Sequence, residues 1–333
     1  ECLSSFMSGF KIEDYLIDYA QNEGIASTLC SYHKNFIGGV DSGVLPKAAM
    51  SVTTSMICDG NINTFRHMEQ KHQVESYVLD IPNAYSPEAE RYVVGQLQEL
   101  IELLETKTGQ KLDMNELKAA IQRESESKEY YKAFLKEQKH RYYPNTMTLD
   151  LYMLFASHLN IGTQETLEFF KCLAEDVKTY PEFNGKGILW VHLMPYYQET
   201  LQQYMNYQEK YYIQACDLNL DYMEPLDEAH PLEALAKKMI LNIYNGPYER
   251  KVEMIRHLVK EFQSDAVIHF CHWGCKQSSG GVMLLKEAMR EENVPMLILD
   301  GDALDRRNSH DGQIKTRLQA FLELIDNIEE DKD

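Results

Sequence analysis

The sequence lacks any stretch of about 18 or more uncharged apolar residues, the length that a membrane-spanning helix needs. It is also short of positive charge, with 33 Lys and Arg against 52 Asp and Glu and a formal net charge of −19. Such a surface repels a phosphate backbone. We therefore expect neither a membrane nor a nucleic acid among the partners of this chain.

Three common motifs are missing as well. There is no G-x-G-x-x-G fingerprint, no Walker A loop and no G-x-S-x-G elbow, so we do not expect NAD binding or ATP hydrolysis. The chain starts at Glu1 with neither an initiator Met nor a basic leader, and we read this start as neither natural nor a signal peptide. We expect the first domain to be incomplete at its N-terminus.

Cysteine is present in an odd number, which makes a poor disulfide framework for a chain of 333 residues. In a reducing compartment such cysteines are core residues, ligands or nucleophiles. Abundant Lys, Glu and Met also fit a cytoplasmic protein, which is the location we expect. The seven positions are Cys2, Cys30, Cys58, Cys172, Cys216, Cys271 and Cys275.

Short β-rich runs alternate with helical patterns near both ends of the chain, which is typical of parallel βαβ units. The middle is helical, and Ser86 before Pro87 is a strong helix start. We predict an α/β protein with a first α/β domain over 1–84, a helical connector or cap over 85–180 and a second α/β domain over 181–333. The expected strands cover 49–54, 76–81, 187–191, 212–216, 266–270 and 295–299.

Three cysteines follow expected strands, where open parallel sheets form their ligand sites. Cys58 follows the 49–54 strand, Cys271 follows the 266–270 strand, and Cys30 follows 24–29, a segment that has the composition of a short strand. A thiol at a strand end near the next helix N-terminus is expected to have a lowered pKa and to be ready for metal or nucleophilic chemistry.

Cys271 and Cys275 enclose the motif C-H-W-G-C. Zinc sites usually have C-x-x-C or paired histidines, whereas iron–sulfur clusters accept scattered cysteines. The spacing alone leaves three alternatives open: a metal or cluster site, a nucleophilic cysteine, or structural thiols. We expect Cys172 to lie in the core of an apolar helix and Cys216 to be structural.

Polar residues near this motif are further candidates. His269, His272 and Ser278 are candidates for catalysis or for hydrogen bonds to sulfur or substrate, although no single residue stands out as a proton-transfer base. Four basic side chains are candidates for phosphate contacts. They are Lys276, Arg306, Arg307 and Arg317.

Five blocks of sequence now carry a resemblance. In order they are Cys30-Ser31-Tyr32 with Gly38-Gly39, Thr53-Thr54 with Cys58-Asp59, Phe270 to Lys276, Leu299 to Asp302, and Gly312 to Phe321. Their order and spacing resemble the 2-hydroxyacyl-CoA dehydratase family, which includes benzoyl-CoA reductase subunits and the double-cubane cluster proteins. The resemblance covers nearly the whole chain.

The resemblance implies two flavodoxin-like parallel-sheet domains joined by helices, with an oxygen-sensitive cluster in the cleft between them. Its three usual ligands match Cys30, Cys58 and Cys271 and imply a [4Fe-4S] cluster, which protein purified in air can lack. Cys275 is additional to this pattern. It is either a further ligand, as a double-cubane [8Fe-9S] cluster would need, or a neighbouring thiol.

The resemblance also implies an activity. A 2-hydroxyacyl-CoA dehydratase is a lyase of anaerobic metabolism that removes water from a CoA thioester through a ketyl radical. The electron comes from an ATP-dependent iron–sulfur activator, and the enzyme contains a homologous second subunit or is a homodimer. The alternatives are an oxidoreductase, either a double-cubane reductase of small molecules or a benzoyl-CoA reductase-like subunit, and a non-catalytic electron-transfer or structural subunit.

Overall fold

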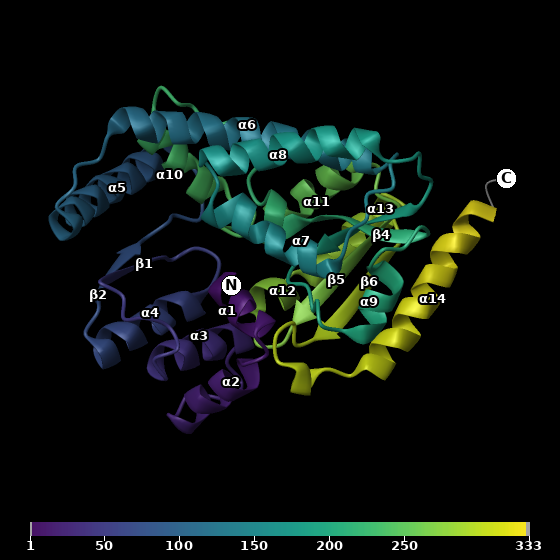
Figure 1. Ribbon diagram of the computed structural model, residues 1–333, viewed down its shortest axis with the longest axis horizontal. Helices are drawn as coiled ribbons and strands as arrows, with labels where there is room; N and C mark the ends of the chain where they lie inside the picture. The colour runs from purple at the N-terminus through teal and green to yellow at the C-terminus, as the bar shows by residue number, and fades with distance from the viewer. Residues whose placement is uncertain (1, 331–333) are drawn as a thin grey trace.

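The computed structural model describes residues 2–330, which form a mixed α/β structure with two parallel sheets and many helices (Figure 1). The predicted fold class is therefore confirmed. All six expected strands are present, within a few residues of the predicted bounds. The division into domains at 84 and 180 stays a prediction.

The first part of the chain holds a two-stranded parallel sheet. Val52 of one strand pairs with Tyr77 of the other, and the connecting helix makes the crossover. The elements are α1 (Cys2–Gly9), α2 (Glu13–Asn22), α3 (Ser31–Asp41), β1 (Met50–Thr54), α4 (Asp59–His72) and β2 (Glu75–Leu79).

The segment 24–29 is not a strand, contrary to our expectation. It consists of turns and irregular structure after α2, and Gly24 has a left-handed φ of +97°. Four of its six residues are exposed and none is buried, so the segment has no apolar face that a sheet would bury. Cys30 therefore lies at the start of α3, without a strand before it.

The helical middle of the chain begins where the sequence predicted. The Ser86 hydroxyl accepts a hydrogen bond from the Ala89 N–H, and the Asp113 carboxylate caps the next helix by accepting from the Asn115 N–H. Two of these helices, α6 and α8, lie side by side in Figure 1. The helices are α5 (Pro87–Thr108), α6 (Met114–Gln138), α7 (Met147–Leu154) and α8 (Gln164–Asp176), with a π-helical turn at Phe155–Leu159.

The last part of the chain forms a four-stranded parallel sheet in the order β4-β3-β5-β6. Its elements are β3 (Lys186–Val191), α9 (Glu199–Met205), β4 (Tyr211–Cys216), α10 (Pro231–Leu241), α11 (Tyr248–Phe262), β5 (Ala266–His272), α12 (Lys276–Ser279), α13 (Val282–Glu291), β6 (Met296–Gly301) and α14 (Asp311–Glu330).

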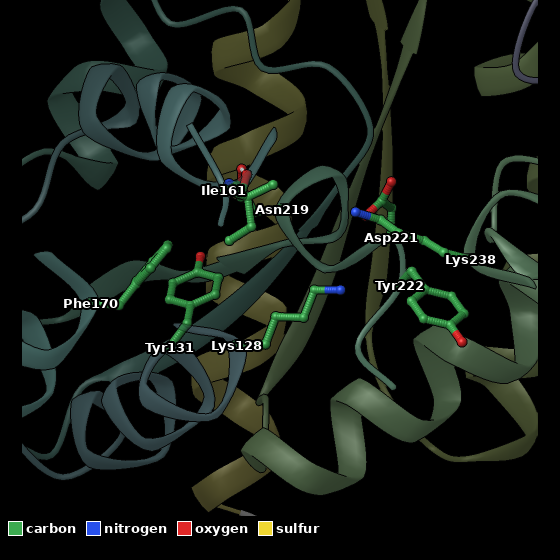
Figure 2. A pocket seen from close by; sticks show the side chains of 9 residues that line it. Lys128, Tyr131, Ile161, Phe170, Asn219, Asp221, Tyr222 and Lys238 are labelled. Atoms are coloured by element: carbon green, nitrogen blue, oxygen red, sulfur yellow. Dashed lines mark hydrogen bonds between the residues drawn. The ribbon is translucent and has the colours of Figure 1, made fainter. Parts of the chain in front are cut away.

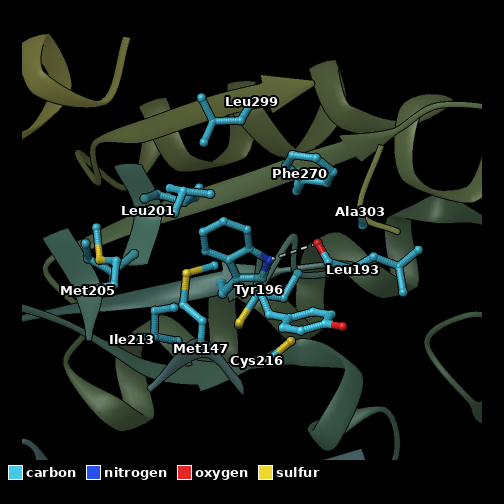
Figure 3. Close-up of a cluster of buried hydrophobic side chains, with 14 of the residues drawn as sticks. Met147, Leu193, Tyr196, Leu201, Met205, Ile213, Cys216, Phe270, Leu299 and Ala303 are labelled. Atoms are coloured by element: carbon cyan, nitrogen blue, oxygen red, sulfur yellow. Dashed lines mark hydrogen bonds between the residues drawn. The ribbon is translucent and has the colours of Figure 1, made fainter. Parts of the chain in front are cut away.

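Alternate residues of this sheet pack into two cores, because side chains of a strand point to opposite faces. Trp190 and Phe270 pack on one face with α7, α9 and α14, whereas Leu189 and Val267 pack on the other with α6, α8, α11 and α13. Figure 3 shows the first core, in which the buried Cys216 lies. Its predicted structural role is therefore consistent with its place.

Candidate functional site

The strand order reverses between β3 and β5, and open sheets bind ligands at the carboxyl ends of strands beside such a reversal. His192 directly follows β3, and Cys271 is the penultimate residue of β5. The strand extends two residues beyond its predicted end, so Cys271 still lies within the paired part of the strand, opposite Asp300.

Cys30 is brought to this edge by a close approach of the loop after β5. Cys30 precedes α3 and is buried. Gly274 has a φ of +77°, and a Cβ atom added to it would lie 2.8 Å from the Cys30 nitrogen and 3.0 Å from its Cα. Only glycine suits both the left-handed backbone and the contact. The loop that carries Cys275 thus lies directly against Cys30.

Cys58 reaches the same region from the first part of the chain. It is the residue before α4, and its sulfur accepts a hydrogen bond from the Gly60 N–H at 3.3 Å. Its neighbour Asp59 lies 3.9 Å from the Lys276 ammonium. Both of these side chains are almost fully exposed, so the ion pair adds little stability. The pair nevertheless shows that the loops bearing Cys58 and Cys275 face each other.

Each of the four candidate cysteines lies within 3.7 Å of a histidine ring nitrogen. The pairs are Cys30 with His272 at 3.2 Å, Cys58 with His33 at 3.6 Å, Cys271 with His269 at 3.7 Å and Cys275 with His192 at 3.7 Å. The sequence had indicated His269 and His272. The sequence analysis missed His33 and His192. His33 is three residues after Cys30. His192 follows a strand, and a position at a strand end is the same signal that had indicated the cysteines.

The tautomer of His272 follows from its partners. The Ala303 N–H donates to Nδ1 at 3.0 Å, so in the neutral ring the proton is on Nε2. Nε2 lies 3.2 Å from the Cys30 sulfur. This buried ring is therefore arranged to donate an N–H···S hydrogen bond, and such bonds tune iron–sulfur centres.

The pKa of two thiols is raised, where we had expected it to be lowered. Burial, with the nearby Cys275, raises the pKa of Cys30 to about 12, and burial raises that of Cys271 as well. The cost of placing a charge in a buried site exceeds the effect of a helix N-terminus here. Both thiols are neutral near pH 7 unless a cation takes the place of the proton.

The rings of His269 and His192, beside Cys271 and Cys275, are neutral. Burial and the charge of Lys251 lower the pKa of His269 to about 3 and hold that of His192 well below its ordinary value. Nδ1 of His192 is buried and makes no hydrogen bond to any residue in the described part of the chain.

The Ser278 hydroxyl makes its hydrogen bonds within the loop after β5. Its fully buried hydroxyl accepts from the His272 N–H at 3.1 Å and lies 3.1 Å from the Cys275 carbonyl oxygen, to which it can donate. These bonds join the two ends of the segment that carries Cys271 and Cys275. The arrangement gives Ser278 a bracing role in the loop.

The predicted phosphate contacts are not supported for the three arginines. Arg317 pairs with Asp300 at 2.8 Å, Arg306 with Glu13 at 2.8 Å, and Arg307 with Asp18 and Asp305. In a chain this acidic, local carboxylates take up these guanidinium groups. Lys276, 95% exposed at its side chain, remains open to solvent.

Cys172 is exposed, and the expectation that it is buried was wrong. The buried face of α8 carries Leu167, Phe170 and Leu173. At 3.6 residues per turn, position 172 falls on the opposite side of the helix.

The donor set fits an iron–sulfur cluster better than a single ion. Across residues 2–330, no group of three or more His, Cys, Asp or Glu is placed to hold one metal ion. A cluster spreads its cysteine ligands over several iron atoms. Thiols from three separate segments, with an N–H donor aimed at one sulfur, are the type of ligand that would suit such a group.

Two hollows elsewhere are not lined by these cysteines. A cavity of about 10 Å³ lies beside Lys128, Tyr131 and Asp221, whose side chains are labelled in Figure 2. It has room for about one water molecule. The second, of about 380 Å³, is an open groove lined by residues such as Tyr85, Asp227 and Lys237. Neither competes with the cysteines as the candidate site.

No helix in the described residues is both long and apolar enough to cross a membrane.

The chain is similar to known proteins over nearly all of its length. A family model described as "2-hydroxyglutaryl-CoA dehydratase, D-component" matches residues 4–325. The alpha subunit of (R)-phenyllactyl-CoA dehydratase from Clostridium sporogenes is 24% identical over 341 residues, covering 93% of this chain and 80% of that protein.

Two further relatives extend the range of named activities. The alpha subunit of lactoyl-CoA dehydratase from Anaerotignum propionicum is 21% identical over 351 residues, covering 93% of this chain and 82% of that protein. One of the subunits of benzoyl-CoA reductase from Thauera aromatica is 19% identical over 346 residues, covering 92% of this chain and 79% of that protein.

Proposed function

Because the chain belongs to the 2-hydroxyglutaryl-CoA dehydratase D-component family, we propose that it is the iron–sulfur subunit of a 2-hydroxyacyl-CoA dehydratase-like enzyme, a lyase. The observation that carries the proposal is the set of four cysteines, each with a histidine ring nitrogen within 3.7 Å. Two relatives are themselves named as alpha subunits of CoA-thioester dehydratases.

Cys30, Cys58 and Cys271 would hold a [4Fe-4S] cluster, because they come from three segments that meet at one sheet edge. When bound, the cluster would supply the low-potential electron that makes the substrate thioester carbonyl a ketyl radical able to expel its α-hydroxyl. The chain's own part is to bind, orient and shield. Burial of Cys30 excludes water, and the His272 N–H stabilises negative charge on its sulfur.

A second candidate, a reductase with a double-cubane [8Fe-9S] cluster, is favoured by the place of Cys275. It follows Gly274, whose backbone lies directly against Cys30, and it stands four residues after Cys271 in the same loop, which supports a role as a further ligand. A benzoyl-CoA reductase-like activity is the related alternative, given the similarity to a component of that enzyme.

The partners follow from the same proposal. The relatives are named as subunits, which supports assembly with a homologous second subunit or a second copy. The reaction would need an acyl-CoA substrate and an ATP-dependent iron–sulfur activator, since this chain has no Walker A loop of its own.

Iron and sulfide quantification on anaerobically purified protein, together with EPR, tests the proposal. About four irons per chain support the dehydratase and about eight the double cubane. C30A, C58A and C271A are each expected to lose iron, whereas C172A, at an exposed cysteine of α8, serves as the matched control. Full iron content in all three variants would contradict the cluster. Failure to bind any acyl-CoA would favour the non-catalytic subunit.

A further inference from the structure

A buried ion pair lies behind two of the four cysteines. The Lys251 ammonium, on α11, is 3.0 Å from the carboxylate of Asp217, which directly follows β4, and both side chains are fully buried. Taking two charges out of water is costly unless further hydrogen bonds satisfy them. Asp217 has such bonds: it accepts from the His192 backbone N–H at 2.6 Å and from the Tyr244 hydroxyl at 2.8 Å.

Lys251 is less well satisfied. Within residues 2–330 its ammonium makes no contact with hydrogen-bond geometry. Besides Asp217 it faces the ring of Tyr244 at 4.3 Å and that of Tyr248 at 5.9 Å. A buried ammonium has three protons to donate, so this cation has capacity to balance a further negative charge nearby.

Lys251 lies beside the rings that touch the cysteines. The Tyr244 ring, 4.3 Å from the Lys251 ammonium, contacts the ring of His192 at 6.1 Å, and the Tyr248 hydroxyl lies 3.5 Å from Nε2 of His269. The two histidine rings stack at 6.4 Å, and each also contacts a thiol, His192 that of Cys275 and His269 that of Cys271. One layer of neutral imidazole thus connects the ion pair with two cysteines.

Asp217 acts on the same layer through the backbone. His192 has a φ of +77°, a left-handed conformation that a non-glycine residue rarely adopts. The short hydrogen bond from its N–H to Asp217 holds it there. Such strained residues persist where the surroundings hold them and often mark functional sites.

We propose that Asp217 and Lys251 are positioning residues for a centre held by thiolates: Asp217 fixes His192 against Cys275, and Lys251 offsets the negative charge that thiolates bring into a buried site. The inference rests on the proposed function, since it concerns the same cluster. Because a reduced cluster carries one more negative charge, Lys251 is expected to favour reduction.

The test is an EPR-monitored redox titration of the anaerobically purified, iron-loaded protein. K251M is expected to shift the midpoint potential to more negative values, and K251R to restore it toward that of the wild type. D217A is expected to retain iron about 10–100-fold less tightly against a chelator, as is usual when the support of a ligand shell is removed.

K128M is the matched control. Lys128 is also a buried lysine in an ion pair, 2.6 Å from Glu124, and lies over the ring of Tyr222 at 5.2 Å, but it borders the small cavity of Figure 2. Its loss is expected to lower thermal stability without moving the potential. A merely structural role of Lys251 would give K251M the same behaviour.

The outcomes separate the two proposals. If K251M keeps full iron and the wild-type potential, this inference is wrong while the cluster stands. If the wild-type protein binds no iron, both are wrong. Should K251M not fold because Asp217 is left unpaired, the double variant K251M/D217N removes both charges together. The potential of the double variant is compared with that of D217N, because the two differ only in the charge of Lys251, and equal potentials would also overturn the inference.

Discussion

The Nε2 atom of His272 lies 3.2 Å from the sulfur of Cys30, and the two residues are separated by 242 positions in the sequence. The ring cannot turn its other nitrogen to the sulfur without losing the bond from the Ala303 N–H. Ser31, the neighbour of Cys30, donates to Asp302 at 2.6 Å. The first part of the chain is therefore joined to the β6 end of the sheet by a hydrogen-bond network centred on a candidate ligand.

This network predicts the effect of replacing His272. H272A removes a buried donor and leaves the Ala303 N–H without its acceptor, which costs roughly 1–3 kcal/mol. It is also expected to weaken iron retention about 10–100-fold. Denaturant unfolding of the metal-free protein measures the first effect, and iron release to a chelator measures the second.

H272Q is the control, because a glutamine amide can still donate toward the sulfur. It is expected to keep more iron than H272A. Equal iron loss in the two variants would mean that the N–H···S bond has no part in holding the centre.

Ile57 carries backbone strain directly before Cys58. Its φ is +73°, which is a true outlier for a β-branched residue and costs of order 1–3 kcal/mol. I57G is therefore expected to hold or raise stability, because relief of strain outweighs the greater freedom of the unfolded chain. Thermal unfolding measures the change.

V52G provides the comparison. Val52 is 37% exposed and Ile57 is 38% exposed, but Val52 lies in strand β1. Glycine there is expected to destabilise by roughly 0.5–1 kcal/mol through backbone freedom alone, and the lost valine side chain adds to this. Similar losses in both variants would argue against strain at Ile57.

The Asp150 carboxyl group is expected to make the free energy of unfolding depend on pH. Desolvation raises its pKa from an ordinary value of about 4 to about 7, despite a hydrogen bond from Asn145. Between these pH values the folded state binds more protons than the unfolded state, so its contribution falls as pH rises from about 4 to about 7. D150N, which cannot ionise, is expected to lose this slope. Urea unfolding of both proteins at several pH values decides the matter, and parallel curves would contradict it.

Patterns that depend on local sequence predicted the fold well. The helix start at Ser86 was right because capping is decided by a few adjacent residues. Strands β3, β4 and β5 were found because nearly all of their residues are buried and read as apolar runs. The less buried β6 also begins with an apolar run.

Features that depend on distant partners were missed. The 24–29 segment failed as a strand because it has no apolar side to bury, and thiol pKa values were misjudged because burial outweighed the helix N-terminus at Cys30. Arg317 was one of four candidates for phosphate contacts, and its partner in the structure is Asp300. Only the folded chain brings such groups together.

Cys275 is the residue that separates the two cluster types. Under the proposed dehydratase function, Cys30, Cys58 and Cys271 are sufficient ligands, so C275A is expected to keep about four irons per chain. C275A also removes the sulfur that lies 3.7 Å from Nε2 of His192. We therefore expect this variant to release iron to a chelator faster than the wild type, without a change in iron content. If Cys275 is instead a ligand of a double cubane, C275A will lose iron already during anaerobic purification. Iron and sulfide counts on C275A, with C172A alongside, distinguish these cases, because both variants remove one thiol and only Cys275 contacts the candidate site.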